Sequence, residues 1–293
     1  MHHFKMLFGA LLATLPVSAQ TSLHQQFQDI AAQAKGRVAV YAQVLETGDT
    51  ASLNAHVHAP MQSVYKFPIA MAVLHTVDQG KLKLDQPVHV TKADYIRVGH
   101  SPLRDAHPDG NIDVTVRELL RYNVAESDGS ACDVLLHLLG GTAAADKYIH
   151  SLGVKEISIA TTEKVQTENE RIQYRNWSTA AGLVQLLHIF YTGRKLSPSS
   201  QQLLMDLMVN STPGAHRIKG QLPAGTVVAH KTGTSGTHDG LTRATNDTGI
   251  ITLPNGQHVL LAVLVTDSRA DEATREQVIA ATAKAAFDHW TSH

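Results

Sequence analysis

The stretch TGIITLPNGQHVLLAVLVT, residues 248–266, is the most informative part of the sequence for the fold. Two apolar runs rich in β-branched residues, Thr248–Leu253 and His258–Thr266, flank the sequence Pro254-Asn255-Gly256. β-Branched residues favour strands, and Pro, Asn and Gly favour a tight turn. These residues therefore predict an antiparallel hairpin near the end of the chain.

Other strands are predicted on both sides of a helical middle region. Val227–Thr232 precedes the hairpin, and near the other end of the chain Arg37–Leu45 is followed by a Thr-Gly-Asp turn and Thr50–Leu53. Helical periodicity is found outside these strands, in Leu23–Ala34 and Ala273–Trp290. This order of elements is most simply packed as one antiparallel sheet built from both ends of the chain.

The predicted fold class is therefore α+β, an antiparallel sheet flanked by helices, with an inserted all-helical subdomain. In the middle region Thr115 and Glu118 form a capping-box pattern at the start of a helix. Residues 155–178 are polar, lack helical periodicity and are expected to form one long loop. The expected parts are residues 20–59 with 213–293 for the α/β subdomain and residues 60–212, including that loop, for the all-helical subdomain. A cleft between two such parts is a common place for a site.

Composition excludes several classes of function. The chain has 293 residues, with 25 Lys and Arg against 26 Asp and Glu, so its formal net charge is −1. It lacks the excess of basic charge that nucleic-acid binding or polybasic membrane anchoring requires. Cys132 is the only cysteine, which excludes an internal disulfide and a cysteine-rich metal site. We expect a monomer without a metal, another cofactor or a nucleic-acid partner.

Residues 1–19 have the pattern of a secretory signal peptide. Lys5 supplies positive charge, Met6–Leu15 is apolar but too short to span a bilayer, and Val17-Ser18-Ala19 offers small residues for cleavage. No later segment is apolar enough to cross a membrane. The mature protein is expected to be exported, either periplasmic or secreted, and not bound to a membrane.

Ser63-Val64-Tyr65-Lys66 is the first of three motifs that can carry chemistry. In a helix this i, i+3 spacing places the Ser63 hydroxyl and the Lys66 amine on one face. A hydroxyl is a weak nucleophile and needs a base within hydrogen-bond reach. The start of a helix here would also direct N–H groups at an oxyanion formed on the serine. The structural alternative is a capping serine beside a solvated lysine.

The second and third motifs supply further hydroxyls and a cation. Ser127-Asp128-Gly129 lies between two helical patterns, where a hydroxyl can relay a proton to a leaving group. Lys231-Thr232-Gly233-Thr234-Ser235-Gly236 ends an apolar strand, and its cation and hydroxyls suit a carboxylate ligand. Alone, each motif has a purely structural reading. Ser-x-x-Lys, Ser-Asp-Asn and Lys-Thr-Gly in this order are the set found in serine β-lactamases and penicillin-binding proteins.

The mature chain resembles the class A serine β-lactamases over nearly its whole length, and the PER-like, extended-spectrum branch in particular. The stretches that carry this resemblance are SPLRDAHPDG (101–110), ESDGSACD (126–133), IQYRNW (172–177) and LPAGTVVAHKTGTSG (222–236). The resemblance implies a β-lactamase/transpeptidase-like fold. It also implies hydrolysis of the β-lactam ring, and hence antibiotic resistance, through an acyl-enzyme on a serine.

The resemblance further implies a role for each matching residue. Ser63 matches the nucleophile, Lys66 its partner in proton transfer, and Ser127 the proton relay to the β-lactam nitrogen. The acylation base, Lys66 or Glu163 acting through water, stays open. The N–H groups of Ser63 and Thr234 match the oxyanion hole. Residues expected to bind the substrate are Lys231, Thr232, Thr234, Ser235 and Arg217, the last standing where this branch places a carboxylate-steering arginine.

The base that activates the deacylating water is expected in the polar segment 155–178. Spacing alone does not choose among Glu163, Glu168 and Glu170. The PER-like pattern places this glutamate at a set distance before the asparagine of Q-Y-x-N-W, here Asn176, and so matches Glu163. Thr167 stands at the position of the family's usual water-holding asparagine, and its hydroxyl is expected to hold that water.

Two further residues of the expected substrate site depart from the family pattern. Gly129 replaces the asparagine of the second motif, which removes an amide that usually binds the acylamino group of the substrate. His100 stands before Ser101-Pro102 where an aromatic gate residue often lies, and an exposed loop histidine is an equal alternative. The change at Gly129 is expected to act on substrate affinity and on the response to inhibitors, and not on the acylation chemistry.

Two other functions share these motifs. A penicillin-binding D-alanyl-D-alanine peptidase lacks the deacylating glutamate loop, and the polar segment 155–178 argues against it. A penicillin sensor that stays acylated is normally tethered to a membrane, and this chain has no second hydrophobic span. A β-lactamase is therefore the preferred function.

Overall fold

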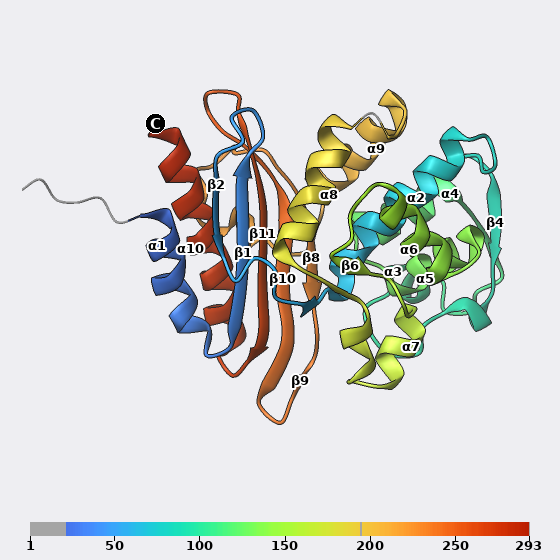
Figure 1. Ribbon diagram of the computed structural model, residues 1–293. Coiled ribbons are helices and arrows are strands. Elements are labelled where there is room, and N and C mark those ends of the chain that lie inside the picture. The colour runs from blue at the N-terminus through green and yellow to red at the C-terminus, as the bar shows by residue number, and fades with distance from the viewer. Residues whose placement is uncertain (1–21, 194, 293) are drawn as a thin grey trace, which may run out of the picture.

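The computed structural model describes residues 22–193 and 195–292, so the predicted signal peptide, residues 1–19, lies outside the described residues. Figure 1 shows a β-sheet with two helices, α1 (Leu23–Ala31) and α10 (Glu272–Thr291), on one face and the other helices on the opposite face. No helix in the described ranges is long and apolar enough to cross a membrane.

The main sheet is antiparallel and is built from both ends of the chain, as predicted. Its strand order is β2-β1-β11-β10-β8, and β9 pairs with the beginning of β10. The bounds are β1 Arg37–Val44, β2 Thr50–Leu53, β8 Val228–Thr234, β9 Thr237–His238, β10 Leu241–Thr252 and β11 His258–Ser268. The predicted hairpin at 248–266 is confirmed, because β10 and β11 pair directly around Pro254-Asn255-Gly256.

The strands on the side of the sheet that carries β8, β9 and β10 extend further than predicted. β10 begins at Leu241 rather than Thr248, and β9 forms a hairpin with it through Asp239 and Gly240, which have positive φ angles of 52° and 70°. Positive φ at both central residues is typical of a two-residue hairpin turn. The first half of β10 is polar, so apolar patterning did not reveal it, yet Asn246 and Asp247 there are fully buried.

Each face of the sheet packs against its own helices because side chains alternate along a strand. On β1, Val38 and Val40 belong to the core under α1 and α10, whereas Ala39 faces the other helices. On β11, Val263 and Leu264 divide in the same way. The sheet is therefore buried on both faces, and the middle region of the chain covers the second one.

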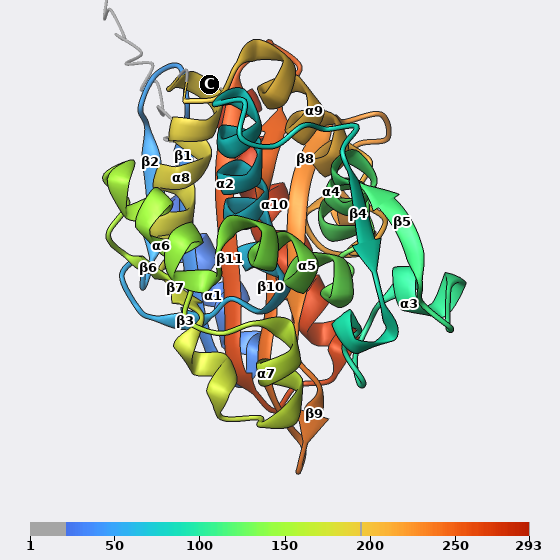
Figure 2. The same cartoon turned by 90° about the vertical axis from the view of Figure 1, so that its right-hand side faces the viewer.

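The helix α2 (Lys66–Asp78) lies at the centre of that middle region (Figure 2). Every residue from Lys66 to Leu74 is buried, as expected for a helix with apolar residues on all sides. The surrounding helices are α3 Pro102–Ala106, α4 Val116–Val124, α5 Gly129–Leu139, α6 Thr142–Ser151, α7 Glu163–Glu168, α8 Ala180–Thr192 and α9 Pro198–Val209. The predicted capping box of Thr115 and Glu118 is present at the start of α4.

Two expectations for the middle region need correction. Residues 60–212 are not all-helical, because short strands pair within them: β4 Pro87–Val90 with β5 Ile112–Thr115, and β7 Trp177–Ser178 with β6 Ile157–Ser158 and with β3 Ala59–Pro60. Residues 155–178 are not one long loop either. They contain β6, α7, the 3₁₀ turn η4 (Ile172–Arg175) and β7. These elements are too short to leave a periodic pattern in the sequence.

The remaining 3₁₀ turns are η1 Ala32–Ala34, η2 Gln62–Tyr65, η3 Lys92–Asp94 and η5 Ile218–Gln221. The turn η2 lies against the edge strand β8 at Gly233. A Cβ atom on Gly233 would lie 2.2 Å from the carbonyl oxygen of Met61 and 3.1 Å from the amide nitrogen of Val64. Glycine is therefore required for this backbone contact, which brings the first and third sequence motifs together.

Candidate active site

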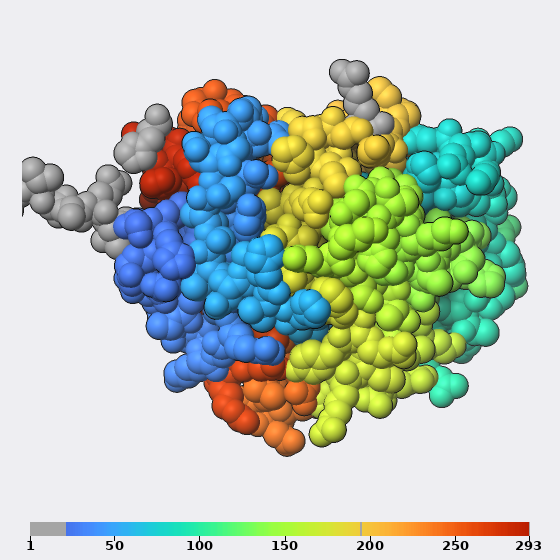
Figure 3. Space-filling view, in the orientation of Figure 1, coloured from blue at the N-terminus to red at the C-terminus, as the bar shows by residue number. Residues whose placement is uncertain are grey.

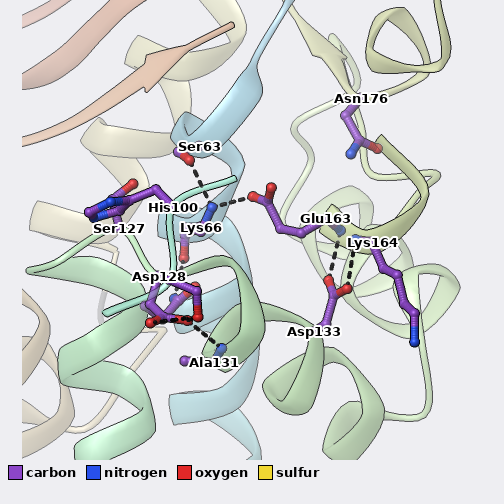
Figure 4. Close-up of polar contacts among 12 residues, drawn as sticks. Ser63, Lys66, His100, Ser127, Asp128, Ala131, Asp133, Glu163, Lys164 and Asn176 are labelled. Carbon is purple, nitrogen blue, oxygen red and sulfur yellow. Dashed lines mark hydrogen bonds and ion pairs between the residues drawn. The ribbon is translucent and has the colours of Figure 1, made fainter. Parts of the chain in front are cut away.

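Ser63, Lys66 and Glu163 form the centre of the site (Figure 4). Ser63 lies in the turn η2 rather than in the α-helix itself, and Lys66 is the first residue of α2. Lys66 Nζ donates to Ser63 Oγ at 2.7 Å and forms an ion pair with the Glu163 carboxylate. Both charged side chains are almost completely buried. One ammonium group thus contacts both the hydroxyl and the carboxylate.

The protonation state of Lys66 follows from its surroundings. Burial lowers the pKa of Lys66, but the negative charge of Glu163, with a smaller effect of Cys132, raises it, and the net direction is upward. A contact with a carboxylate in a site with little water favours the charged amine. Lys66 is therefore an ammonium in the resting site, where it donates hydrogen bonds and must give up a proton before it can accept one.

Asp133 on α5 holds the backbone of the segment that carries Glu163. Its two carboxylate oxygens accept from the backbone N–H groups of Glu163 at 2.7 Å and Lys164 at 2.8 Å (Figure 4). Burial raises the pKa of Asp133 to about 6. Asp133 was not among the predicted site residues, although a carboxylate within an apolar helical run is a signal that could have identified it.

Asn176 holds the other end of the same segment. Its side-chain oxygen accepts from the N–H groups of Ala160 at 2.7 Å and Thr161 at 2.9 Å, and its amide nitrogen donates to the Thr161 carbonyl at 2.8 Å. Gln62 Nε2 adds a contact from η2 to Gln173 Oε1 at 2.7 Å. The ends of the segment are therefore held close together, and Glu163 is directed at Lys66.

Ser127 reaches the site from the turn before α5. It has a positive φ of 60°, which is uncommon for a non-glycine residue and occurs mainly where function requires it. Asp128 fixes this turn by accepting from the N–H groups of Leu103 at 2.6 Å and Ala131 at 2.8 Å. Lys231 Nζ donates to Ser127 Oγ at 2.8 Å, which joins the second motif to the third.

Lys231 is a buried cation without a neutralising partner in the site. Burial, followed by the positive charge of Lys66, lowers the pKa of Lys231 well below its usual range. Within residues 22–193 and 195–292 no carboxylate forms an ion pair with it. An anionic ligand beside Lys231 would supply the missing opposite charge and would stabilise the ammonium form.

The edge strand β8 offers an N–H group to the site. Ser235 N–H donates to the Ala244 carbonyl of β10 at 2.9 Å. Because N–H groups of successive residues in a strand point to opposite sides, the Thr234 N–H points away from β10. β8 is the last strand of the sheet on this side, so the Thr234 N–H faces η2, where Ser63 lies. This arrangement suits an oxyanion formed on Ser63.

Arg217 lies behind the edge strand rather than in the open site. Its guanidinium is buried and donates to Thr234 Oγ1 at 2.8 Å, to the Asn246 carbonyl at 3.0 Å and to Glu276 Oε1 at 3.0 Å. Asn246 also donates to the Pro60 carbonyl at 2.8 Å and so ties β10 to the segment before η2. Arg217 therefore acts on the site through the hydroxyl of Thr234.

A cavity of about 620 Å³ surrounds these groups. Of the residues predicted from the sequence, it is lined by Ser63, Lys66, His100, Ser127, Glu163, Thr167, Thr234 and Ser235. The predicted residues that do not line it are Arg217, Lys231, Thr232 and Gly129. Glu168 and Glu170, the two other candidate glutamates, line its wall, but only Glu163 contacts Lys66.

Three of the predicted substrate residues have different surroundings from those expected. Thr232 is buried. A Cβ atom on Gly214 would lie 2.4 Å from the methyl carbon of Thr232, so this side chain packs directly against Gly214. A Cβ on Gly129 would lie 2.4 Å from Ile96 Cδ1, so Ile96 fills the space over this glycine. The Thr167 hydroxyl donates to the Lys164 carbonyl of its own helix at 2.9 Å.

His100, the expected gate residue, is fixed at the rim of the cavity. Its ring nitrogen Nε2 lies 2.8 Å from the Glu126 carbonyl, and its own carbonyl accepts from the N–H of Gly129 at 3.0 Å. Both contacts join the loop before α3 to the turn that carries Ser127. The imidazole is therefore part of the rim, next to the second motif.

Comparisons with known proteins agree with this site. Residues 22–290 match the model of the β-lactamase enzyme family. The chain is 42% identical over 276 residues to the extended-spectrum β-lactamase PER-1 of Pseudomonas aeruginosa, with 94% of this chain and 90% of that protein covered. It is 40% identical over 244 residues to the β-lactamase VEB-1 of Pseudomonas aeruginosa, covering 83% and 81%. The crystal structure of a β-lactamase from Chitinophaga pinensis superposes with a TM-score of 0.90 at 46% identity, covering 92% of this chain and 99% of that one.

Proposed function

We propose a role for each site residue on the premise that this chain belongs to the β-lactamase enzyme family, as a class A enzyme. Its reaction is the hydrolysis of β-lactams. The peptidase alternative is not favoured, because the matched relatives are β-lactamases. The observation that supports the catalytic roles most strongly is the contact of Lys66 with both Ser63 and Glu163.

In the acylation step Ser63 Oγ attacks the carbonyl carbon of the β-lactam. Because Lys66 is an ammonium, we assign the removal of the Ser63 proton to a relay in which Lys66 passes a proton to Glu163 as it accepts the serine proton. The N–H groups of Ser63 and Thr234 stabilise the negative charge that develops on the carbonyl oxygen. The C–N bond of the ring then breaks, and Ser127 gives its proton to the departing nitrogen. The proton held by Glu163 then returns to Ser127 through Lys66 and water in the cavity that all three residues line, so Glu163 becomes a carboxylate again. Lys231, in contact with Ser127, stays charged.

In the deacylation step Glu163 removes a proton from a water molecule, which attacks the ester carbonyl of the acyl-enzyme. The ester bond to Ser63 Oγ breaks, and the proton taken up by Glu163 returns to Ser63 through Lys66, which contacts both. Asp133 and Asn176 contribute by holding the segment that carries Glu163. This role requires a carboxylate held close to the nucleophile, which the buried position of Glu163 supplies.

Binding of the substrate carboxylate is assigned to the end of β8. Lys231 supplies positive charge, and the hydroxyl groups of Thr234 and Ser235 line the cavity beside it. Arg217 orients the Thr234 hydroxyl from behind. Thr232 contributes its backbone, whose carbonyl accepts from Lys231 Nζ at 3.1 Å.

The mature protein is proposed to be exported as a monomer, with residues 1–19 removed. The sequence pattern of this segment supports the proposal, with a positive charge at Lys5, a short apolar stretch and small residues at 17–19. Osmotic-shock fractionation together with the intact mass of the product tests it. A cytoplasmic product that retains residues 1–19 would contradict export. Light scattering tests the oligomeric state.

The experiment that tests the catalytic proposal is time-resolved intact-mass spectrometry of the mature protein mixed with a chromogenic cephalosporin. Steady release of colour, with the mass of the protein returning to that of the free enzyme, is the expected result. A single burst of colour that leaves a lasting adduct on Ser63 would mean a peptidase or a sensor. In that case the deacylating role of Glu163 would be wrong.

A further inference from the structure

Arg243 on β10 connects two walls of the catalytic cavity. Its side chain crosses to the segment after α7, where Nε donates to Glu170 Oε1 at 2.5 Å and Nη1 donates to the hydroxyl of Tyr174 at 3.4 Å. In Figure 3 the yellow-green surface of this segment lies beside the orange surface of the β9–β10 hairpin. Glu170 itself lines the cavity.

The backbone of the same arginine holds the opposite wall. The N–H groups of Arg243 and Ala244 both donate to Ser235 Oγ at 3.0 Å, and Ser235 lines the cavity at the end of β8. The side chain of Arg243 thus fixes one wall to the strand that supports the other. The Arg243–Glu170 contact is therefore one of the contacts that set the separation of the two walls.

A second group of contacts extends this connection across β11 to β1, at the same end of the sheet. The hydroxyl of Tyr174 donates to the Asp267 carboxylate at the end of β11, and Arg37 Nη2 donates to the same carboxylate at 2.6 Å. The segment from Glu168 to Tyr174 is thus held by Arg243 of β10 and Asp267 of β11, and Arg37 of β1 supports Asp267. Of these contacts, only the Arg243–Glu170 pair lies at the cavity itself.

The Arg243–Glu170 pair has a short hydrogen bond, but both of its side chains are partly exposed to water. The side chain of Arg243 is 20% exposed and that of Glu170 is 31% exposed. Ion pairs at such positions contribute little energy and are weakened by salt. The hydrogen bond from Arg243 keeps the pKa of Glu170 below its usual range, so the pair stays charged at neutral pH. A contact of this kind can open without unfolding the protein.

The part of the cavity next to this pair is not used in catalysis. Glu168, Glu170, Gln173, Gly236 and His238 line it but contact neither Ser63 nor Lys66 in any hydrogen bond of the described residues. When Ser63, Ser127 and Lys231 hold the reacting ring and its carboxylate, the remaining part of the substrate must occupy this space. That part is the side chain on the ring carbon next to the lactam carbonyl.

Building on the proposed function, we propose that the Arg243–Glu170 pair is a latch that sets the width of this part of the cavity and so determines which β-lactam side chains are accepted. With the latch closed, the two walls are held together and the site favours narrow side chains. When the latch is released, the segment 168–174 moves away from β9 and admits bulky, branched side chains. Arg243 is a specificity-determining residue and takes no part in bond making.

The test compares two cephalosporins with the same nucleus and leaving group, one with a narrow arylacetamido side chain and one with a branched oxyimino side chain. The measured quantity is the ratio of their kcat/KM values, oxyimino over arylacetamido. In Arg243→Gln, which keeps the backbone N–H bonds to Ser235, we expect this ratio to rise about two- to fivefold, mainly through KM. Glu170→Gln should give the same rise without touching β10.

Salt and charge reversal separate a latch from a general loss of structure. The ratio of the wild-type enzyme should rise between low and high sodium chloride concentration, whereas that of Arg243→Gln should not change. The double variant Arg243→Glu with Glu170→Arg should return the ratio toward the wild-type value. Arg269→Gln is the matched control, because Arg269 donates to the Asp239 carbonyl of the same hairpin but forms no contact with segment 168–174.

The outcomes distinguish a failure of the proposed latch from a failure of the proposed function. If the wild-type enzyme hydrolyses both cephalosporins and neither Arg243→Gln nor Glu170→Gln changes the ratio, the latch is refuted and the proposed function stands. If Arg269→Gln changes the ratio as much as Arg243→Gln does, the latch is also refuted. If the wild-type enzyme hydrolyses neither cephalosporin, the proposed function fails first.

Discussion

Arg217 Nη2 donates to Thr234 Oγ1 at 2.8 Å, so an arginine that the sequence placed in the substrate site acts from behind it. The same guanidinium contacts the Asn246 carbonyl and Glu276, and it is 4% exposed. Its positive charge therefore reaches a bound carboxylate through the orientation of the Thr234 hydroxyl and through space, without direct contact.

The first prediction concerns this indirect role. Arg217→Lys keeps the charge but lacks the second arm of the guanidinium that reaches Thr234. We expect KM for a cephalosporin to rise about tenfold, the effect of one hydrogen bond to a charged group, with kcat changed far less. Steady-state kinetics measure both values. A fall in kcat with KM unchanged would instead place Arg217 in the chemical step.

The second prediction separates the two chemical steps at Glu163. In Glu163→Gln, Lys66 loses its anionic partner, burial favours its neutral amine, and that amine can take the Ser63 proton directly, so acylation is affected less than deacylation. No carboxylate is present to activate the deacylating water, so the acyl-enzyme should accumulate. General-base catalysis typically contributes about 10²- to 10⁴-fold, and we expect kcat to fall by that factor. Intact-mass spectrometry should find the adduct of the opened β-lactam on the variant during turnover. Turnover at the wild-type rate would refute the assignment.

Lys231 gives the third prediction, because it is the buried cation without an ionic partner in the site. Lys231→Ala should lower kcat/KM about 10- to 100-fold for a β-lactam with a free carboxylate. For the methyl ester of the same β-lactam the loss should be smaller, since the ester has no charge for Lys231 to bind. An equal loss for acid and ester would show that Lys231 acts only through its contact with Ser127.

The fourth prediction follows from the buried carboxyl of Asp133. Its pKa is raised from 3.8 to about 6 in the folded protein, so the folded state binds the proton more tightly than the unfolded state does. The stabilisation from this group is complete below about pH 3.8 and is lost as the pH rises through about 6, a change of about 3 kcal/mol.

Urea unfolding between pH 4 and 7 measures this effect against Asp133→Asn, which cannot ionise. The free energy of unfolding of the wild type should fall relative to that of the variant as the pH rises through this range. Parallel profiles for the two proteins would mean that Asp133 is not the titrating group. The variant should also deacylate more slowly, because an amide accepts from the N–H groups of Glu163 and Lys164 through one oxygen only.

The fifth prediction tests the backbone contact between β8 and η2. In Gly233→Ala the new methyl group would lie 2.2 Å from the Met61 carbonyl oxygen, and neither backbone can yield cheaply. The Thr234 N–H should move away from Ser63, and the acylation rate should fall about 10²- to 10³-fold, as when an oxyanion-hole donor is lost. Stopped-flow acylation measures this rate. Gly220→Ala is the control, because its nearest neighbour, the Ala280 side chain, lies at 3.3 Å.

Several elements were readable from the sequence because the information is local. Apolar runs rich in β-branched residues and the Pro-Asn-Gly turn predicted the β10–β11 hairpin, and the Thr115–Glu118 capping box predicted the start of α4. The first half of β10 was missed because its buried residues are polar. Its side chains are paired instead, as Asp247 is with His230 at 2.9 Å.

The site residues also divide into those that the local sequence identifies and those that only the packing of the chain selects. Ser63 and Lys66 could be paired from the sequence because residues three positions apart in a helical turn lie on the same face. In the structure Lys66 Nζ lies 2.7 Å from Ser63 Oγ. Among Glu163, Glu168 and Glu170, spacing gave no choice without the family resemblance. The packing of the folded chain selects Glu163, because of these three glutamates only Glu163 is directed inward by Asp133 and paired with Lys66.

The sequence by itself therefore determined the order of the elements, the three motifs and the family of the chain, since these depend on residue types at short separations. Tertiary structure decided which polar groups meet: Lys66 with Glu163, Lys231 with Ser127, and Arg243 with Glu170. These partners lie far apart in the chain, and their protonation and strength depend on burial and on neighbouring charge. Burial and neighbouring charge arise only when the sheet and the helical region pack together.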